Sequence, residues 1–568
     1  MKAIKFTAIG ILAASSMLFT ACFDLEEQAF SEIITENIEF GDNELASMVS
    51  SGYGNLSYIL GWQGLFDSQE EAADVIITPT RPNGWDDGGT YKRMHRHTWS
   101  NEEWQPANTY ETAFEAINFC NRILTQIEAG DIPVAEDTRA RYVPELRALR
   151  ALWYSLLLDQ HGNVPIVTKF STEVPTQSTR KEVYEFVVKE LTEVIDAGTV
   201  TKEKTYSTLN HWSIEMLLMR VYLNAEVYAG VKAYDKALKL AEDIIENSPY
   251  RLSATYAENF AVDLGPSNTE VIFAVVYDEL QGVTHSQCRK WYPPVSKNYF
   301  GWGFQCWGGN CCNPQFYNSY QEGDRRKEDT WFHGPMVAAD GKLVWTCLNY
   351  LPSVSCNPAD SGVGEGQDCT SIDFGLRQKK YEPDVNGIYY WDNDFPYFRL
   401  AEAYYTAAEC ILRGEHGKKS AADYVNAVRS RSVSTPITDA ELRADTKMVY
   451  GLVPWGALTY ADIQKYNGSH DWSPIADKLE ASQANDKIIR SGHDTDPVEL
   501  GGMYDEWGWE FALECQRRTQ MIRFGTFSNR NWFNKPAIND THDQLFPIPL
   551  WILQDNPNLK QNPGYAGA

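Results

Sequence analysis

The segment PTRPNGWDDGG, residues 79 to 89, sets one tryptophan among residues that favour turns over helices or strands. An aromatic ring beside short polar side chains suits sugar binding, because a sugar has apolar C–H faces and a polar hydroxyl edge. Trp85 would supply the stacking face, and Asn83, Asp86 and Asp87 would supply hydrogen-bonding groups. The alternative is that Trp85 only fills the interior of its loop.

Other polar side chains could also bind the hydroxyl groups of a sugar. Carboxylates accept hydrogen bonds, amides both donate and accept them, and a guanidinium group donates several in a fixed fork. The candidates are Asp67 in GLFDSQEEAADV, Asp42 and Asn43 in FGDNEL, and Arg377 in FGLRQKK. Asp42, Asn43 and Asp67 each have an alternative role as a helix N-cap.

The most aromatic part of the chain lies within residues 278 to 395, where WYPPVSKNYFGWGFQCWGGNCCNPQFYNSY shows no helical or strand period. A loop this long inside a domain usually carries function or structure of its own. Trp302, Cys306 and Trp307 are candidate ligand contacts, with a small core inside the loop as the alternative. His95 and His97 are expected to pack or to lie on the surface.

Composition excludes several classes of function. The formal net charge of −27 and the absence of a basic run argue against nucleic acid as a partner and favour a neutral ligand. Common hydrolase, metalloprotease and nucleotide-binding motifs are absent from the sequence. A glycosidase needs two placed carboxylates, but among 77 acidic residues a sequence pair carries little information. We therefore expect no enzyme and no cofactor; a structural calcium ion stays open, without a loop motif to place it.

Cysteines are spread unevenly. Cys120, Cys410 and Cys515 lie in helical patterns and are expected to be small buried thiols. A second group gathers in one region: Cys288, Cys306, Cys311, Cys312, Cys347, Cys356 and Cys369. This clustering predicts one or more disulfides, whose pairing the spacing does not determine.

The N-terminus has the pattern of a secretory signal over residues 1 to 21. Two lysines precede an apolar run, and small residues precede Cys22. The pattern resembles a bacterial lipoprotein signal, in which Cys22 is lipidated and anchors the chain to a membrane. The alternative is an ordinary cleaved signal with a chance cysteine.

Two parts of the chain show helical periodicity with alanines at close-packing positions. Helices are predicted over 143–158 and 184–195, and helix pairs over 211–247 and 395–432. Pairs of this kind are similar to tetratricopeptide units, although their spacing departs from a regular repeat.

Motifs in order along the whole chain resemble those of the RagB/SusD family of surface lipoproteins. They include LRALRALWYSLLLDQHGNVPIV, NTEVIFAV, GDRR at 323–326, NAVRSR, WGWEFALECQRRTQMIRFG and the ending LFPIPLWILQDNPNLKQNPGY. Cys515 is a departure, because glycine is often found there in the family.

The resemblance implies a mainly α fold: a tetratricopeptide-like helical-pair scaffold with long irregular loop insertions and minor β structure. It divides the chain into the signal and one domain, 22–568. That domain has an N-terminal helical part (about 30–275), a loop-rich ligand-facing insertion (about 278–395) and a C-terminal helical part (about 396–568).

The resemblance also implies a function at the cell surface. Members capture oligosaccharides and act as a hinged lid on a TonB-dependent (SusC-like) transporter barrel in the outer membrane. The loop pattern is most similar to fructan-binding members, of levan or inulin type. The alternatives are a glycoside hydrolase and a helical-repeat adaptor for proteins or peptides.

Overall fold

A computed structural model describes residues 40–81, 85–355, 368–458, 462, 465–466 and 468–567. The predicted signal, Cys22 and Asn83 lie outside these residues. Within them, each helix is too short or too polar to cross a bilayer.

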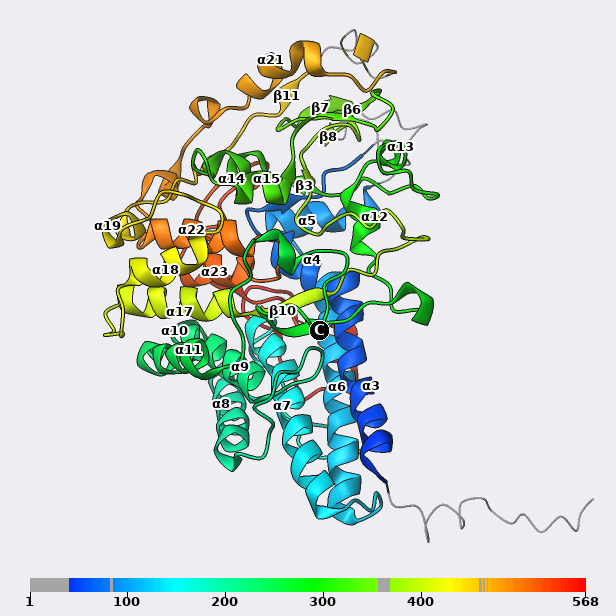
Figure 1. The fold of residues 1–568 in the computed structure, drawn as a ribbon, viewed down its shortest axis with the longest axis vertical. Helices are drawn as coiled ribbons and strands as arrows, with labels where there is room; N and C mark the ends of the chain where they lie inside the picture. Colours follow the sequence, from blue (N-terminus) through cyan, green and yellow to red (C-terminus); the bar gives the residue numbers. More distant parts are fainter. Residues whose placement is uncertain are drawn as a thin grey trace, which may run out of the picture.

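Long helices form the lower part of the molecule in Figure 1. α3 (Asp42–Gly61) packs against α6 (Trp104–Ala129) and α7 (Glu136–Gln160), and α8 (Arg180–Ala197) packs on α7. The predicted helices over 143–158 and 184–195 are confirmed within α7 and α8. A capping box between Thr179 and Glu182 fixes the start of α8.

The two predicted helix pairs are confirmed and lie side by side. The first comprises α9 (His211–Leu223), α10 (Ala225–Ala229) and α11 (Tyr234–Asn247). The second comprises α17 (Leu400–Leu412) and α18 (Ala421–Arg429), and α11 packs on α17. Alanines 237, 241, 407, 408 and 421 are fully buried, so the helices approach closely there.

One predicted helix begins later than expected. FPYFR forms strand β10 (Phe395–Arg399), which pairs antiparallel with β2 (Val271–Val275), and the helix starts at Leu400. Every residue of both strands is buried, so aromatic side chains favour the strand over a helix turn.

Short elements make up the loop-rich upper part of Figure 1 and connect the helices. The remaining helices are α4 (Leu65–Glu70), α5 (Thr90–Arg96), α12 (Gln287–Trp291), α13 (Lys297–Phe300), α14 (Pro314–Ser319), α15 (Arg326–Thr330), α19 (Asp439–Arg443), α21 (Ala476–Ala481), α22 (Gly501–Phe511), α23 (Arg517–Arg523) and α24 (Leu550–Asp555). The antiparallel strand pairs are β1 (Ile76–Ile77) with β3 (Cys311–Cys312), β4 (Trp331–Phe332) with β9 (Arg377–Gln378), and β5 (Gly334–Val337) with β6 (Leu343–Cys347). β7 (Pro352–Ser355) lies between antiparallel β8 (Asp368–Cys369) and parallel β11 (Gly456–Ala457).

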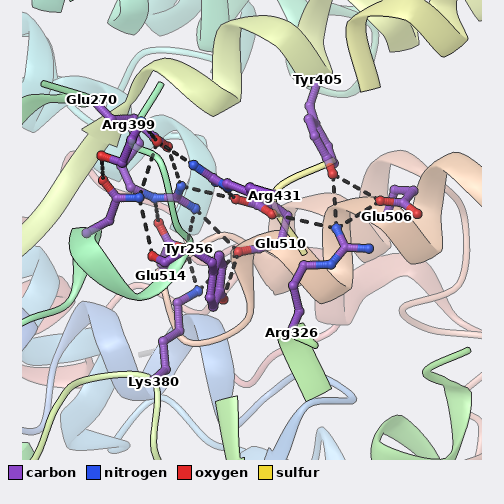
Figure 2. Close-up of polar contacts among 12 residues, drawn as sticks. Tyr256, Glu270, Arg326, Lys380, Arg399, Tyr405, Arg431, Glu506, Glu510 and Glu514 are labelled. Carbon is purple, nitrogen blue, oxygen red and sulfur yellow. Dashed lines mark hydrogen bonds and ion pairs between the residues drawn. The ribbon is translucent and has the colours of Figure 1, made fainter. Parts of the chain in front are cut away.

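A network of buried ion pairs joins segments that are far apart in the sequence (Figure 2). Arg399 on β10 lies 2.8 Å from Glu270 and 2.7 Å from Glu514, and Arg431 contacts both Glu270 and Glu510. Nearby, Arg326 pairs with Asp324, Glu506 and Glu510, Arg429 with Glu506, and Lys380 with Glu514. The GDRR, NAVRSR and WGWEFALE motifs therefore meet in the core.

The sequence predicted one or more disulfides in the cysteine cluster, and packing or surface positions for His95 and His97. Cys369 is disulfide-bonded, but the other described cysteines are free buried thiols, so the cluster is held mainly by packing. His95 and His97 are buried and bond to Phe533 O and to Asp543 and Ala72 O. Burial lowers the pKa of His95 to about 3 and of His97 to about 4, which leaves both rings neutral at pH 7.

Candidate functional site

An open depression with a volume of about 570 Å³ lies where the end of α3, the loop before α5, α12 and the loop after α13 meet. Its lining is mostly aromatic and polar: Trp62, Gln63, Trp85, Asp87, Arg289, Pro294, Gln305, Cys306 and Trp307. Three of the residues predicted from the sequence, Trp85, Cys306 and Trp307, are thus brought together.

Two half-buried tryptophans form the aromatic part of this site. The rings of Trp62 and Trp307 lie 5.2 Å apart, centroid to centroid, at an angle of 72°. Such an edge-to-face pair is a favourable aromatic arrangement. The two rings make a corner in the lining of the depression, and each is only partly buried.

Trp85 contacts the backbone of Trp307 and so helps to hold this pair of tryptophans in place. Its ring is only 8% exposed and lies edge-on to Tyr91, with centroids 5.7 Å apart. Its Nε1–H donates a 2.6 Å hydrogen bond to the carbonyl oxygen of Trp307. The ring packs so closely on Gly309 that a Cβ there would lie 2.9 Å from it. Trp85 therefore lines the depression and also fills the interior of its loop, as the alternative interpretation predicted.

α12 fixes the position of the Trp307 backbone. The Trp307 N–H donates to Arg289 O at 2.5 Å, and the Gly309 N–H donates to Lys290 O at 2.7 Å. Arg289 also places its guanidinium 4.7 Å from the Trp307 ring centroid and 3.9 Å from that of Tyr389. These cation–π contacts hold Trp307 next to the exposed Tyr389.

Polar side chains of the depression come from tight turns. Gln63 and Asp87 have φ angles of 50° and 42°, a region that costs a non-glycine residue free energy and often occurs at functional sites. Partial burial raises the pKa of Asp87, and the positive charge of Lys290 opposes that shift. Burial also raises the pKa of Cys306 to about 12, so its thiol stays protonated. Asp87, Gln63 and Gln305 thus offer the site a carboxylate and two amides.

Asp67, a candidate ligand contact from the sequence, is a core residue instead. Its side chain is fully buried and lies 2.8 Å from Lys290 Nζ, which is also 2.8 Å from Glu71. It is not a helix cap either, since Gly64 holds the N-cap position of α4. Asp67 fixes α12 on α4 beneath the depression and cannot reach a ligand there.

Arg377 and Trp302 are also core residues. The Arg377 guanidinium is fully buried and donates to the carbonyl oxygens of Asn310, Ile372 and Phe374. Trp302 is 5% exposed, stacks on Phe300 with centroids 4.2 Å apart, and donates to Asp384 O. For Trp302, the alternative of a small core inside the loop is the correct one.

Asp42 and Asn43 lie at the opposite end of α3 from Trp62. A 20-residue helix spans about 30 Å, so these two residues are remote from the depression. The N-cap is Gly41 without a side-chain hydrogen bond, and Asp42 instead lies 3.5 Å from Arg141. Asp42 and Asn43 therefore do not line the depression, and neither residue is the N-cap of α3.

Sequence reasoning missed Trp62, Gln63, Arg289 and Gln305. Trp62 did carry a signal, because YILGWQGLF places it between glycines after a helical pattern, in the same kind of context as Trp85. No sequence pattern marked Arg289, because only the packing of α12 places this arginine beside Trp307.

The fold and the candidate site define a class of protein: a tetratricopeptide-like helical scaffold whose loops carry an aromatic depression. The SusD family model matches residues 269–565, and a model described as "Starch-binding associating with outer membrane" matches 71–223. The chain belongs to the SusD family. Membership places it among SusD-like binding proteins rather than enzymes.

Known proteins resemble the chain over most of its length. The starch-binding protein SusD of Bacteroides thetaiotaomicron is 25% identical over 532 residues, covering 85% of this chain and 82% of that protein. A SusD-like protein of Formosa agariphila is 22% identical and covers 96% of each chain. Surface glycan-binding protein A of Bacteroides thetaiotaomicron, solved with laminarihexaose, has a TM-score of 0.64 at 19% identity and covers 92% of this chain and 99% of that one. The corresponding protein of Bacteroides uniformis has a TM-score of 0.66 at 18% identity, with the same coverage, and both likenesses show the fold.

Proposed function

We propose that the chain binds a neutral oligosaccharide in the depression lined by Trp62 and Trp307. The observation that carries this proposal is the corner of two half-buried tryptophans, edged by Asp87, Gln63 and Gln305. An aromatic face matches the C–H face of a sugar ring, and the carboxylate and amides match its hydroxyl groups. The starch-binding and laminarihexaose-binding relatives support the same class of ligand.

Charge supports a neutral ligand over an anionic one. The chain carries a formal net charge of −27, which repels anions. Among the described lining residues, Arg289 supplies the guanidinium; it is 4% exposed and already stacked on aromatic rings, so it is poorly placed to bind an acidic sugar.

The carboxylates of the site favour binding over hydrolysis. A glycosidase holds two carboxyl groups about 5 to 10 Å apart across the bond it cleaves. Among the described residues that line the depression, Asp87 supplies the single carboxylate. New reducing ends released from polysaccharide by a trace of the protein would contradict this part of the proposal.

The finer parts of the proposal rest on family resemblance. They are a fructan ligand of levan or inulin type, lipidation of Cys22, a place at the outer-membrane surface and a role as the lid of a TonB-dependent transporter. An anchor and a transporter partner would raise the effective concentration of ligand at the pore, which makes weak sugar contacts sufficient. Co-purification from solubilised membranes tests the partnership; recovery of the chain always alone would contradict it.

Isothermal titration against levan, inulin, laminarin and starch oligosaccharides tests the binding site. We expect one of them to bind, and Trp307→Ala and Trp62→Ala each to weaken that binding at least about tenfold, or ~1.4 kcal/mol. Trp551→Ala is the matched control, because Trp551 is 37% exposed on α24 and lies outside the depression. Equal binding by all four proteins would remove this depression as the site.

A further inference from the structure

A second cavity, of about 640 Å³, lies among α8, α9 and α11, and its lining shares no residue with the aromatic depression. These helices are neighbours in the green and cyan part of Figure 1. The cavity is rich in carboxylates from Asp196, Glu215, Asp235, Glu242, Asp243 and Glu246, against the amino groups of Lys236, Lys239 and Lys418. Its charge balance therefore attracts cations.

Two potential metal ligands, Glu215 and Asp243, line this cavity, and His211 lies beside them. His211 and Glu215 lie one turn apart on α9, with His211 Nε2 and Glu215 Oε1 3.1 Å apart. Asp243 approaches from α11, and the ligand atoms of all three residues lie within 4.8 Å of one another. One imidazole and two carboxylates form a ligand set used by divalent transition metals.

A buried carboxylate oxygen of this cluster lacks a hydrogen-bond partner among the described residues. Glu215 is 4% exposed and lines the cavity, yet its Oε2 has no hydrogen-bond partner among the described residues. The hydroxyl of Thr192 on α8, which lines the same cavity, is also buried without a partner there. A buried carboxylate oxygen without a partner is costly, and a bound cation removes that cost.

We propose that His211, Glu215 and Asp243 bind one divalent transition-metal ion, of which Zn²⁺ is the best match. Imidazole and carboxylate suit Zn²⁺, whereas Ca²⁺ takes oxygen ligands only. Bonds of about 2.0 to 2.2 Å put tetrahedral ligand atoms roughly 3.4 Å apart, which the His211–Glu215 pair already approaches. Half-buried Asp243 closes the site by a small side-chain movement; its Oδ1 accepts from Asn247, which leaves Oδ2 for the ion.

The ion has a structural role in this arrangement. It joins α9 to α11, the two main helices of the first tetratricopeptide-like pair. Binding to the folded chain alone stabilises it in proportion to the logarithm of the ion concentration. Sugar binding at the distant depression should not depend on it.

Titration of the EDTA-treated full chain with ZnCl₂ tests the site. We expect one Zn²⁺ per chain, a rise in the melting temperature, and visible absorption bands when Co²⁺ replaces Zn²⁺. Asp243→Asn and Glu215→Gln should each weaken binding at least about tenfold and reduce the Co²⁺ bands. Asp235→Asn is the matched control, since Asp235 lines the same cavity but lies outside the ligand cluster.

Two outcomes would overturn the proposal. One is wild-type chain that binds no stoichiometric Zn²⁺, in which case water satisfies Glu215. The other is undiminished binding by Asp243→Asn and Glu215→Gln proteins that keep the wild-type circular dichroism spectrum. Because Asp243 is only half-buried, Asp243→Asn is the variant more certain to fold.

Discussion

Trp85 shows how one side chain can be part of a site and part of the core. Its indole N–H fixes the backbone of Trp307, and its ring lies against Gly309, where no side chain fits. The polar and glycine-rich sequence around it favours an irregular turn, and that turn lets a buried ring bridge two loops.

Gly309→Ala should displace Trp85. The added Cβ would lie 2.9 Å from the Trp85 ring and from Lys290 Cγ, so both must move. We expect a loss of about 1 to 3 kcal/mol in the free energy of unfolding and weaker oligosaccharide binding. Gly303→Ala, in the same loop but with no atom within 4 Å of its added Cβ, is the control for denaturant unfolding and titration. Equal effects of the two substitutions would contradict the role given to Trp85.

Cys515 has a physical explanation at this scale as well. Its φ is 58°, in the left-handed region that favours glycine, which accounts for the glycine that family resemblance leads one to expect there. Its buried thiol has a pKa raised well above the ordinary value by burial, so it acts as a small apolar group.

At the scale of elements, α12 depends on a buried ion pair for its place. Lys290 lies 2.8 Å from both Asp67 and Glu71, and all three side chains are fully buried. The two carboxylates raise the pKa of Lys290 above its ordinary value although burial acts in the opposite direction. The pair thus holds α12, and with it Arg289 and Trp307, against the segment that follows α4.

Lys290→Met should destabilise the fold by about 3 to 5 kcal/mol, because it leaves two buried carboxylates without their cation. Adding Asp67→Asn should recover part of that loss. Lys342→Met is the control, since Lys342 pairs with Asp340 on the surface and such pairs contribute about 1 kcal/mol or less. Denaturant unfolding measures all of them; similar losses for Lys290→Met and Lys342→Met would contradict this account of α12.

At the scale of the whole molecule, buried polar contacts join residues near the start of the described chain to residues near its end. Asp74 lies 2.7 Å from Arg517, and Glu70 on α4 accepts a 3.3 Å hydrogen bond from the Leu513 N–H. These contacts tie the early residues to Leu513 and to α23, and the network around Arg399 and Glu510 in Figure 2 ties the middle of the chain to α22. One apolar cluster also runs from Leu45 to Leu559.

Glu70 should make stability depend on pH. Burial raises its pKa from 4.5 to about 7, with the Leu513 N–H opposing the shift. The folded chain therefore holds the proton more tightly, and this stabilising contribution is complete below about pH 4.5 and lost as pH rises through 7.

Glu70→Gln removes this ionisation. We expect the variant to gain stability relative to wild type by up to about 3 kcal/mol between pH 4.5 and pH 7.5. Urea unfolding of both proteins at the two pH values measures the gain, with the exposed Glu128→Gln as a control for lost charge. A pH-independent difference between wild type and Glu70→Gln would rule out the proposed ionisation.

Much of the helical fold could be predicted, because apolar residues at helical spacing indicate which face of a helix is buried. The stripe of Tyr234, Ala237, Leu238, Ala241 and Ile244 is buried as its spacing predicts. The start of α17 could not be placed, because FPYFR becomes a strand only when β2 is there to pair with it. Of the candidate site residues, Trp85, Cys306 and Trp307 line one depression, whereas Asp67, Arg377 and Trp302 are buried and do not line it.

The sequence by itself determined the helical pairs, the resemblance to the SusD family and the presence of an aromatic loop region, because these follow from local spacing and from motif order. Only the tertiary structure decided which aromatic and charged side chains face solvent. Trp62 and Trp307 are in contact although 245 residues separate them in the sequence. Lys290 pairs with the buried Asp67 although 223 residues separate them. A side chain's type states what it can bind, but whether a ligand can reach it depends on non-local packing, which no local pattern encodes.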